Sequence, residues 1–311
     1  RDRVPGMGGV GENRAFRANL RALQGWQLNS RVISDVKEPD TTAALFGYQL
    51  SLPVIAAPVT GVTTNMGGGL SEEDYVRAVV RGCRAARTLA CVGDRATPDK
   101  YRVNLQAVAD AGGCGIAVFK PLCDQAALLR RLRDAEQAGL AAVGLDLDSV
   151  PLATMHHAAT RVEPKSATQL AELIQATRLP FIVKGVLTPA DARLAVELGA
   201  KALIVSNHGG RVLDSLPGAA TVLPEIAAAV AGKILIIADG GVRSGEDVFT
   251  YLALGADLVT AGRPLAICAI GAGETGVCFY LNHLRTGLRH AMQLTGRATL
   301  AELDASALRP A

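Results

Sequence analysis

From residue 53 onward, short β-rich runs alternate with helical segments at fairly regular spacing. Eight runs are strand candidates: residues 53–57, 88–91, 115–119, 141–146, 180–184, 202–206, 234–238 and 258–261. Helical patterns fall between them, including residues 71–86, 124–138, 166–176, 189–198 and 245–254. A parallel sheet with crossover helices requires this alternation. We therefore predict an α/β chain whose eight βα units close into a (β/α)8 TIM barrel.

The residues before the first strand candidate are expected to form an arm. Residues 1–52 would pack on the barrel of residues 53–311 within one domain, wrapping its base, with residues 45–52 as a hairpin-like plug. The arm contains Gly6-Met7-Gly8-Gly9-Val10-Gly11, which matches the dinucleotide fingerprint G-x-G-x-x-G. No strand precedes these glycines, so we reject that interpretation. At the other end we expect an eighth helix over residues 273–291 and an extra helix in the tail.

Composition argues against several kinds of partner. The 32 basic residues are interspersed with 29 acidic ones and aromatics make up 4%, which disfavours nucleic acid. No apolar run reaches the roughly 18 residues that a membrane span needs. No signal peptide opens the printed chain, so we expect a cytoplasmic protein. The six cysteines show no C-x-x-C spacing, which indicates reduced thiols and no metal site.

Polar residues follow the sixth and fifth strand candidates. Ser206-Asn207-His208-Gly209-Gly210-Arg211 comes directly after an apolar run. A histidine and an arginine at one mouth provide a proton acceptor and a fixed cation, which suits a small anionic substrate. Lys184 closes the preceding strand, and we expect its ammonium to enter the mouth with little competing charge nearby. A lysine there can stabilise negative charge on a reduced cofactor.

The seventh and eighth strand candidates end in a predicted phosphate site. They lead into Asp239-Gly240-Gly241-Val242-Arg243 and Gly262-Arg263. Glycines let backbone N–H groups approach an anion, the helix from Ser244 would point its positive end inward, and the two arginines supply bidentate donors. This part indicates the ligand class rather than the reaction.

Together these motifs resemble the FMN-dependent 2-hydroxy-acid oxidase and dehydrogenase family, which includes glycolate oxidase, lactate oxidase and mandelate dehydrogenase. The most specific match is the segment from Ser206 to Asp214, which is similar to the family's S-N-H-G-[GA]-R-x-L-D. The resemblance implies bound FMN, with His208 as the base that takes a substrate proton while hydride passes to flavin N5. Arg211 would bind the substrate carboxylate. Lys184 would lie beside the N1 and O2 edge of the flavin.

Other cofactor contacts are implied by the same resemblance. Asp239 would contact the ribityl chain or the phosphate-binding turn, and Arg243 with Arg263 would hold the phosphate. The turn Ala57-Pro58-Val59-Thr60 resembles the family's A-P-T-A turn, whose backbone lies against the flavin ring. The remaining implied cofactor-binding residues are Gly93, Asp146, Ser206, Gly241 and Gly262. A homo-oligomer, commonly a tetramer, is also implied.

The chain departs from the family in the substrate pocket. A tyrosine usual after the third strand is replaced by Lys120, and the second carboxylate-binding arginine falls near Met155 in a shortened loop. Asp146 and Asp148 stand where the family often has threonine and aspartate. We therefore include Lys120 and Asp148 with His208 and Arg211 as catalytic candidates, and expect a larger or differently charged acid than lactate.

Two alternatives stay open. One is an FMN barrel with non-oxidase chemistry, as in type 2 isopentenyl diphosphate isomerases, which share the phosphate turn but lack the histidine segment. The other is a flavin-binding protein without oxidase activity. The short loop favours it, as does the loss of two tyrosines usual in the family, one in the arm near Pro5 and one at Lys120. Joint retention of His208, Arg211 and Lys184 argues against the second alternative.

Overall fold

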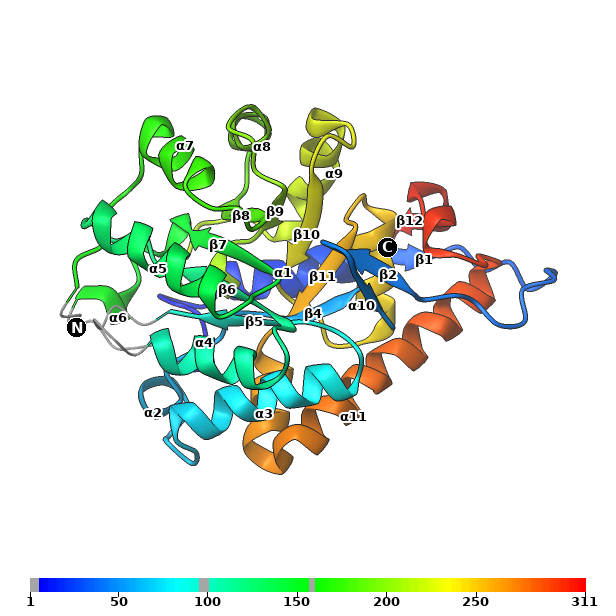
Figure 1. The fold of residues 1–311 in the computed structure, drawn as a ribbon. Helices are drawn as coiled ribbons and strands as arrows, with labels where there is room; N and C mark the ends of the chain where they lie inside the picture. The colour runs from blue at the N-terminus through cyan, green and yellow to red at the C-terminus, as the bar shows by residue number, and fades with distance from the viewer. Residues whose placement is uncertain (1–5, 95–100, 157–159) are drawn as a thin grey trace.

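Eight parallel strands close into a barrel in the computed structural model, which describes residues 6–94, 101–156 and 160–311 (Figure 1). The strands are β4 (Val54–Ala56), β5 (Ala90–Gly93), β6 (Gly115–Phe119), β7 (Ala142–Asp146), β8 (Phe181–Val186), β9 (Ala202–Val205), β10 (Leu235–Asp239) and β11 (Leu258–Ala261). The pairing of β11 with β4 completes the ring. All eight predicted strands and the predicted barrel are confirmed.

Helices alternate with these strands and surround the barrel in Figure 1. They are α3 (Glu72–Ala85), α4 (Tyr101–Asp110), α5 (Gln125–Gln137), α7 (Ala167–Gln175), α8 (Pro189–Glu197), α9 (Ala219–Val230), α10 (Gly245–Ala253) and α11 (Arg263–Thr295). Local sequence fixes several starts. The Ser71 side chain accepts from the Asp74 N–H before α3, and Thr188 does the same for Asp191 before α8, where Pro189 takes the first helical position.

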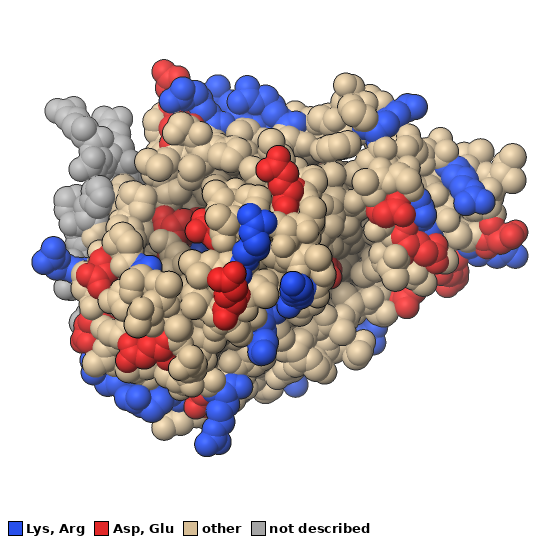
Figure 2. All heavy atoms as spheres, turned by 90° about the horizontal axis from the view of Figure 1, so that it is seen from above, with Lys and Arg blue, Asp and Glu red and all other residues tan. Residues whose placement is uncertain are grey.

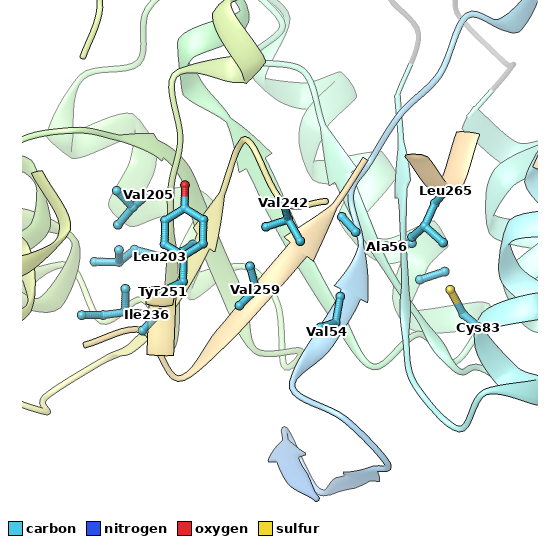
Figure 3. Close-up of a cluster of buried hydrophobic side chains, with 14 of the residues drawn as sticks. Val54, Ala56, Cys83, Leu203, Val205, Ile236, Val242, Tyr251, Val259 and Leu265 are labelled. Atoms are coloured by element: carbon cyan, nitrogen blue, oxygen red, sulfur yellow. The ribbon is translucent and has the colours of Figure 1, made fainter. Parts of the chain in front are cut away.

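Both faces of the barrel strands are buried, and alternate residues along a strand pack into two different hydrophobic clusters. Ile55, Ile204 and Ile237 belong to a cluster inside the barrel. Their chain neighbours, such as Val54 and Leu203, join the larger cluster between the strands and the surrounding helices (Figure 3). Strands buried on both sides explain why they appear in the sequence as nearly continuous apolar runs.

A hairpin closes the base of the barrel. The strands β2 (Ala43–Leu45) and β3 (Tyr48–Leu50) pair antiparallel, and Leu45 and Leu50 pack into the interior cluster. In Figure 1, β2 lies at one end of the barrel and α6 (Ala153–His156), which follows the carboxyl end of β7, lies at the other. The predicted hairpin plug is confirmed.

The beginning of the arm lies elsewhere than expected. Helix α1 (Arg14–Gln24) contacts α9 and the 3₁₀ turn η2 (His208–Gly210), which follows β9 at the mouth. The expectation that the whole arm wraps the base is therefore wrong. Asp214 explains the placement, because its carboxylate accepts from the N–H groups of Glu12, Arg14 and Ala15 and so caps the start of α1. The strand β1 (Trp26–Leu28) then pairs with β12 (Leu308–Pro310).

The end of the chain also differs from the sequence prediction. Helix α11 starts ten residues before the predicted eighth helix and is interrupted at Ala272 and Gly273. The tail forms two short 3₁₀ turns, η3 (Leu300–Glu302) and η4 (Ala305–Ala307), and strand β12 instead of an extra helix. By length and composition alone, α11 is long and apolar enough to span a membrane, although the sequence analysis expected no such segment. Its packing against α3 and α10 and its interruption in the first third of its length account for it as a barrel helix.

Candidate active site

A cavity of about 500 Å³ opens at the carboxyl ends of the strands. It brings together most of the predicted site residues, namely Pro58, Val59, Thr60, Lys120, Asp146, Lys184, His208, Arg211, Asp239, Gly262 and Arg263. Five other predicted residues do not line it: Gly93, Asp148, Ser206, Gly241 and Arg243. Because parallel strands end on the same side of a barrel, residues distant in sequence converge here.

His208 is oriented by a carboxylate. Its Nδ1 lies 2.9 Å from Asp148 Oδ1 and 3.3 Å from Lys184 Nζ. The Lys184 ammonium can only donate and an ionised carboxylate can only accept, so these two neighbours favour opposite tautomers of the ring. The contact with Asp148 is the shorter one, and we therefore assign the hydrogen to Nδ1. In the neutral ring this leaves Nε2 without a proton. His208 is therefore arranged to accept a proton at Nε2.

The backbone at His208 is strained and is held by neighbouring side chains. Its φ of 56° lies in the left-handed region, which non-glycine residues rarely adopt. The His208 N–H donates to Ser206 Oγ at 3.0 Å, and Ser206 Oγ donates to Asp239 at 2.6 Å. Thr260 donates to the other oxygen of Asp239 at 2.7 Å. Ser206 and Asp239 thus support the turn that presents the imidazole.

Lys184 lies among several charges, so the expectation of little competing charge is wrong. Its Nζ is 2.7 Å from Asp146 Oδ1 and 3.6 Å from Asp148 Oδ1. Lys120 Nζ donates to the other oxygen of Asp146 at 2.5 Å. Although burial raises the pKa of Asp146, the neighbouring His208, Lys120 and Lys184 hold that pKa well below its ordinary value. Asp146 therefore joins two lysines as a buried carboxylate.

Arg211 and Arg263 contact the beginning of the arm. Arg211 donates to Gly6 O at 2.9 Å. Arg263 donates to Met7 O at 2.6 Å and to Gly8 O at 2.9 Å, and its guanidinium lies over the Phe16 ring. Among the described residues, neither arginine forms an ion pair with a carboxylate. The rejected glycine-rich motif thus serves as a set of carbonyl acceptors at the mouth.

The predicted phosphate turn brings a third arginine close to these two. Burial, together with the nearby Arg211 and Arg243, lowers the pKa of Arg263 to about 10, against the opposing effect of Asp239. Arg243 itself is exposed and donates to its own neighbour, Val242 O. Gly241 has a φ of 85°, as a tight turn before α10 requires. The arrangement concentrates positive charge that suits an anion.

The end of β5 contributes a carboxylate that the sequence prediction missed. Gly93 lets this strand pack against the turn after β4, because a Cβ there would lie 2.6 Å from Pro58 O. Asp94 follows it, lines the cavity, pairs with the buried Arg131 and accepts from the Lys120 N–H at 3.1 Å. Burial raises the pKa of Asp94 to about 6, against the opposing effect of Arg131. The rule that locates working residues at strand ends would have found this residue.

Part of the cavity lining is apolar and comes from loops. Met7 of the arm, Met66 after β4, and Leu152 and Met155 after β7 line it. Met155, near which the family's second carboxylate-binding arginine falls, thus lines the cavity. Met7, Met66 and Leu152 were not predicted, because a strand pattern does not show how loops fold over a mouth. Asn65, also unpredicted, lines the cavity beside Arg211.

Three possible metal ligands lie together in the described part of the chain. Oxygen atoms of Asp146 and Asp148 and a ring nitrogen of His208 are within 4.8 Å of one another. The ammonium of Lys184 contacts all three residues, at 2.7 to 3.6 Å. Since Lys184 and Lys120 together already balance the charge of the two carboxylates, we assign no metal to the cluster. On the face seen in Figure 2, Lys and Arg side chains are interspersed with Asp and Glu.

Comparisons with known proteins agree with this geometry. A family model described as FMN-dependent dehydrogenase matches residues 6–167 and 150–310. Glycolate oxidase from Spinacia oleracea is 32% identical, with 93% of this chain and 85% of the relative covered. L-lactate oxidase from Lacticaseibacillus rhamnosus is 32% identical, with 92% and 83% covered. A crystal structure of mandelate oxidase has a TM-score of 0.86 at 30% identity, covering 100% of this chain and 95% of that one.

Proposed function

We propose, from the premise that this chain belongs to the FMN-dependent dehydrogenase family, that His208 and Arg211 carry out its reaction at the mouth of the barrel. The protein is an FMN-dependent oxidoreductase of the 2-hydroxy-acid oxidase type. The observation that carries the proposal is the hydrogen bond between Asp148 Oδ1 and His208 Nδ1 at 2.9 Å. It leaves the other ring nitrogen as a base in the cavity that Arg211 also lines.

The residues at the mouth fit FMN. Arg211, Arg243 and Arg263 concentrate positive charge at the mouth. Within the described ranges, Arg211 and Arg263 have no carboxylate partner. A phosphate dianion would balance this charge. Arg243 and Arg263 would hold the phosphate. Lys184 and the turn from Pro58 to Thr60 would lie along the ring system. When bound, FMN supplies the acceptor for the hydrogen and the two electrons that leave C2 of the substrate.

The protein's own side chains bind the substrate and move its proton. Arg211 would bind the substrate carboxylate, which fixes the C2 hydroxyl next to His208. His208 Nε2 would take the hydroxyl proton, and Asp148 would stabilise the imidazolium that forms. The product is then a 2-oxo acid. Lys120 and Lys184 share Asp146, so they enter this chemistry as part of a buried ionic group and not as isolated cations.

The substrate class follows from the cavity wall. We propose a 2-hydroxy acid with a bulkier side chain than lactate. Met7, Met66, Leu152 and Met155 support this, because they add apolar, adaptable surface to the cavity that the charged residues also line. Met155 also replaces the arginine that the family has near this position, so Arg211 is the main carboxylate ligand in the proposal.

Anaerobic mixing of the FMN-loaded protein with a panel of 2-hydroxy acids tests the proposed function. The panel runs from glycolate and lactate to acids with branched and aromatic side chains. We expect the flavin absorbance to bleach, most rapidly with a bulky apolar acid, with one 2-oxo acid formed per flavin reduced. Bound flavin that no member bleaches would favour a binding protein without oxidase activity.

Two further proposals concern assembly and location. A homo-oligomer is supported by Ile267 and Phe279 of α11, whose large apolar side chains are 61% and 72% exposed. Light scattering of the purified protein tests this. A cytoplasmic location is supported by the six free cysteines, since a reducing compartment keeps thiols reduced.

A further inference from the structure

Asn65 connects two parts of the mouth that lie on different strands of the barrel. It is the last residue of α2 (Val62–Asn65), in the loop after β4, and it lines the cavity. Its Oδ1 accepts from the Arg211 guanidinium at 2.9 Å. Its Nδ2 donates to Thr60 O at 3.2 Å. One amide group thus joins Arg211, after β9, to the turn that carries Pro58 and Thr60.

The two partners of Asn65 leave only one orientation of its amide. A guanidinium has five N–H donors and no acceptor, whereas a backbone carbonyl only accepts. Reversing the amide would therefore set an NH₂ group against the guanidinium and a carbonyl against a carbonyl. No other side chain of the same size donates on one side and accepts on the other.

The loop that carries Asn65 is itself anchored. Glu72, in the first turn of α3, accepts from the Gly61 N–H at 2.7 Å and from the Val62 N–H at 2.9 Å. The Asn65 N–H donates to Gly61 O at 2.7 Å, which closes the single turn of α2. The amide is therefore presented from a fixed backbone. Gly6 O accepts from a second nitrogen of Arg211 at 2.9 Å, so the guanidinium plane is held at two corners.

We infer that Asn65 is a positioning residue that sets the Arg211 guanidinium for the substrate carboxylate. This rests on the proposed role of Arg211. Two N–H donors are used by neutral acceptors, which orient the group without cancelling its charge, and the other donors stay available for an anion. Asn65 does not itself touch the reacting atoms in this account.

The Asn65 side chain is neutral, whereas an aspartate at this position would carry a negative charge. Asn65→Asp keeps the shape but loses the donor to Thr60 O and places a negative charge beside Arg211. The guanidinium would then be neutralised before a substrate enters. Asn65→Ala removes both contacts and leaves Arg211 charged but less well oriented. The aspartate variant should therefore bind anions more weakly than the alanine variant.

Binding of pyruvate to the FMN-loaded protein tests the inference without turnover. Pyruvate has a carboxylate but no hydroxyl to oxidise, and its binding is followed by the change in flavin absorbance. We expect Asn65→Ala to weaken binding about tenfold and Asn65→Asp by about a hundredfold, on the scale of lost hydrogen bonds to a charged group. The Michaelis constant for the best 2-hydroxy acid should rise in parallel, with little change in kcat or in FMN affinity. Thr63→Ala, on the exposed side of the same turn, is the matched control and should match the unmodified protein.

The outcomes separate this inference from the proposed function. If Arg211→Ala weakens pyruvate binding and both Asn65 variants bind like the unmodified protein, the inference is wrong and the role of Arg211 stands. If Arg211→Ala binds pyruvate normally, both are wrong. If the Asn65 variants lose FMN or stability in proportion to their loss of pyruvate binding, Asn65 has a structural role and the inference is again overturned.

Discussion

Asp148 accepts a hydrogen bond from His208 across two strand ends, with 2.9 Å between Oδ1 and Nδ1. Asp148→Asn would replace an obligatory acceptor by an amide that can donate to Nδ1, which favours the tautomer with its hydrogen on Nε2. We predict that flavin reduction by a 2-hydroxy acid slows by about 10²-fold or more. FMN affinity should stay the same. Anaerobic rapid mixing gives the rate, and an unchanged rate would remove Asp148 from the mechanism.

Lys120 and Asp146 form a buried pair, with side chains 9% and 4% exposed. Lys120→Met leaves the carboxylate with fewer cations, and Asp146→Thr leaves two lysines without it. Each single substitution should lower the free energy of unfolding by about 3 kcal/mol. The double variant should lose clearly less than the sum, because it removes both buried charges together. Urea unfolding of the four proteins gives the coupling, and additive losses would show that the two side chains act independently.

Much of the candidate site was predictable because its residues follow strands directly. Lys184, His208, Asp239 and Arg263 come at the ends of apolar runs, and the barrel closes those ends onto one mouth. The ionic contacts among them were not predictable. The pairing register that sets Asp146 beside Lys184 also determines which charges meet, and sequence spacing does not show it.

The arm shows a second limit of the sequence. The contact between Arg263 Nε and Met7 O joins residues 256 positions apart, and no local pattern indicates it. The hairpin of β2 and β3 was predictable because its apolar residues are close in sequence. The beginning of the arm was not predictable, since it is held by Asp214 and the two mouth arginines, which lie about 200 or more positions later in the chain.

Asp94 should make stability depend on pH in an unusual direction. Burial raises its pKa in the folded chain from 3.8 to about 6, so between these values the folded chain binds more protons than the unfolded chain. The contribution of Asp94 to the free energy of unfolding should therefore rise as pH falls from about 7 to about 4, by about 2 to 3 kcal/mol. Unfolding of the unmodified protein and Asp94→Asn at several pH values measures it. A difference between the two proteins that is constant with pH would contradict the assignment.

Arg263 and Arg243 allow the arm and the phosphate to be tested separately. Arg263→Ala removes donors to Met7 O and Gly8 O, so trypsin should cleave faster at the exposed Arg14 and Arg17. It should also weaken FMN binding by about 2 kcal/mol through the lost phosphate contact. Arg243→Ala should weaken FMN binding without changing the cleavage rate. Normal FMN affinity in both variants would place the phosphate elsewhere.

The comparison of His208→Ala with the unmodified protein, both FMN-loaded and mixed anaerobically with the best 2-hydroxy acid, tests the central claim most directly. The account predicts that the variant keeps its FMN, binds pyruvate, and is reduced at least about 10²-fold more slowly than the unmodified protein. A variant whose flavin bleaches at the normal rate would show that another group takes the substrate proton.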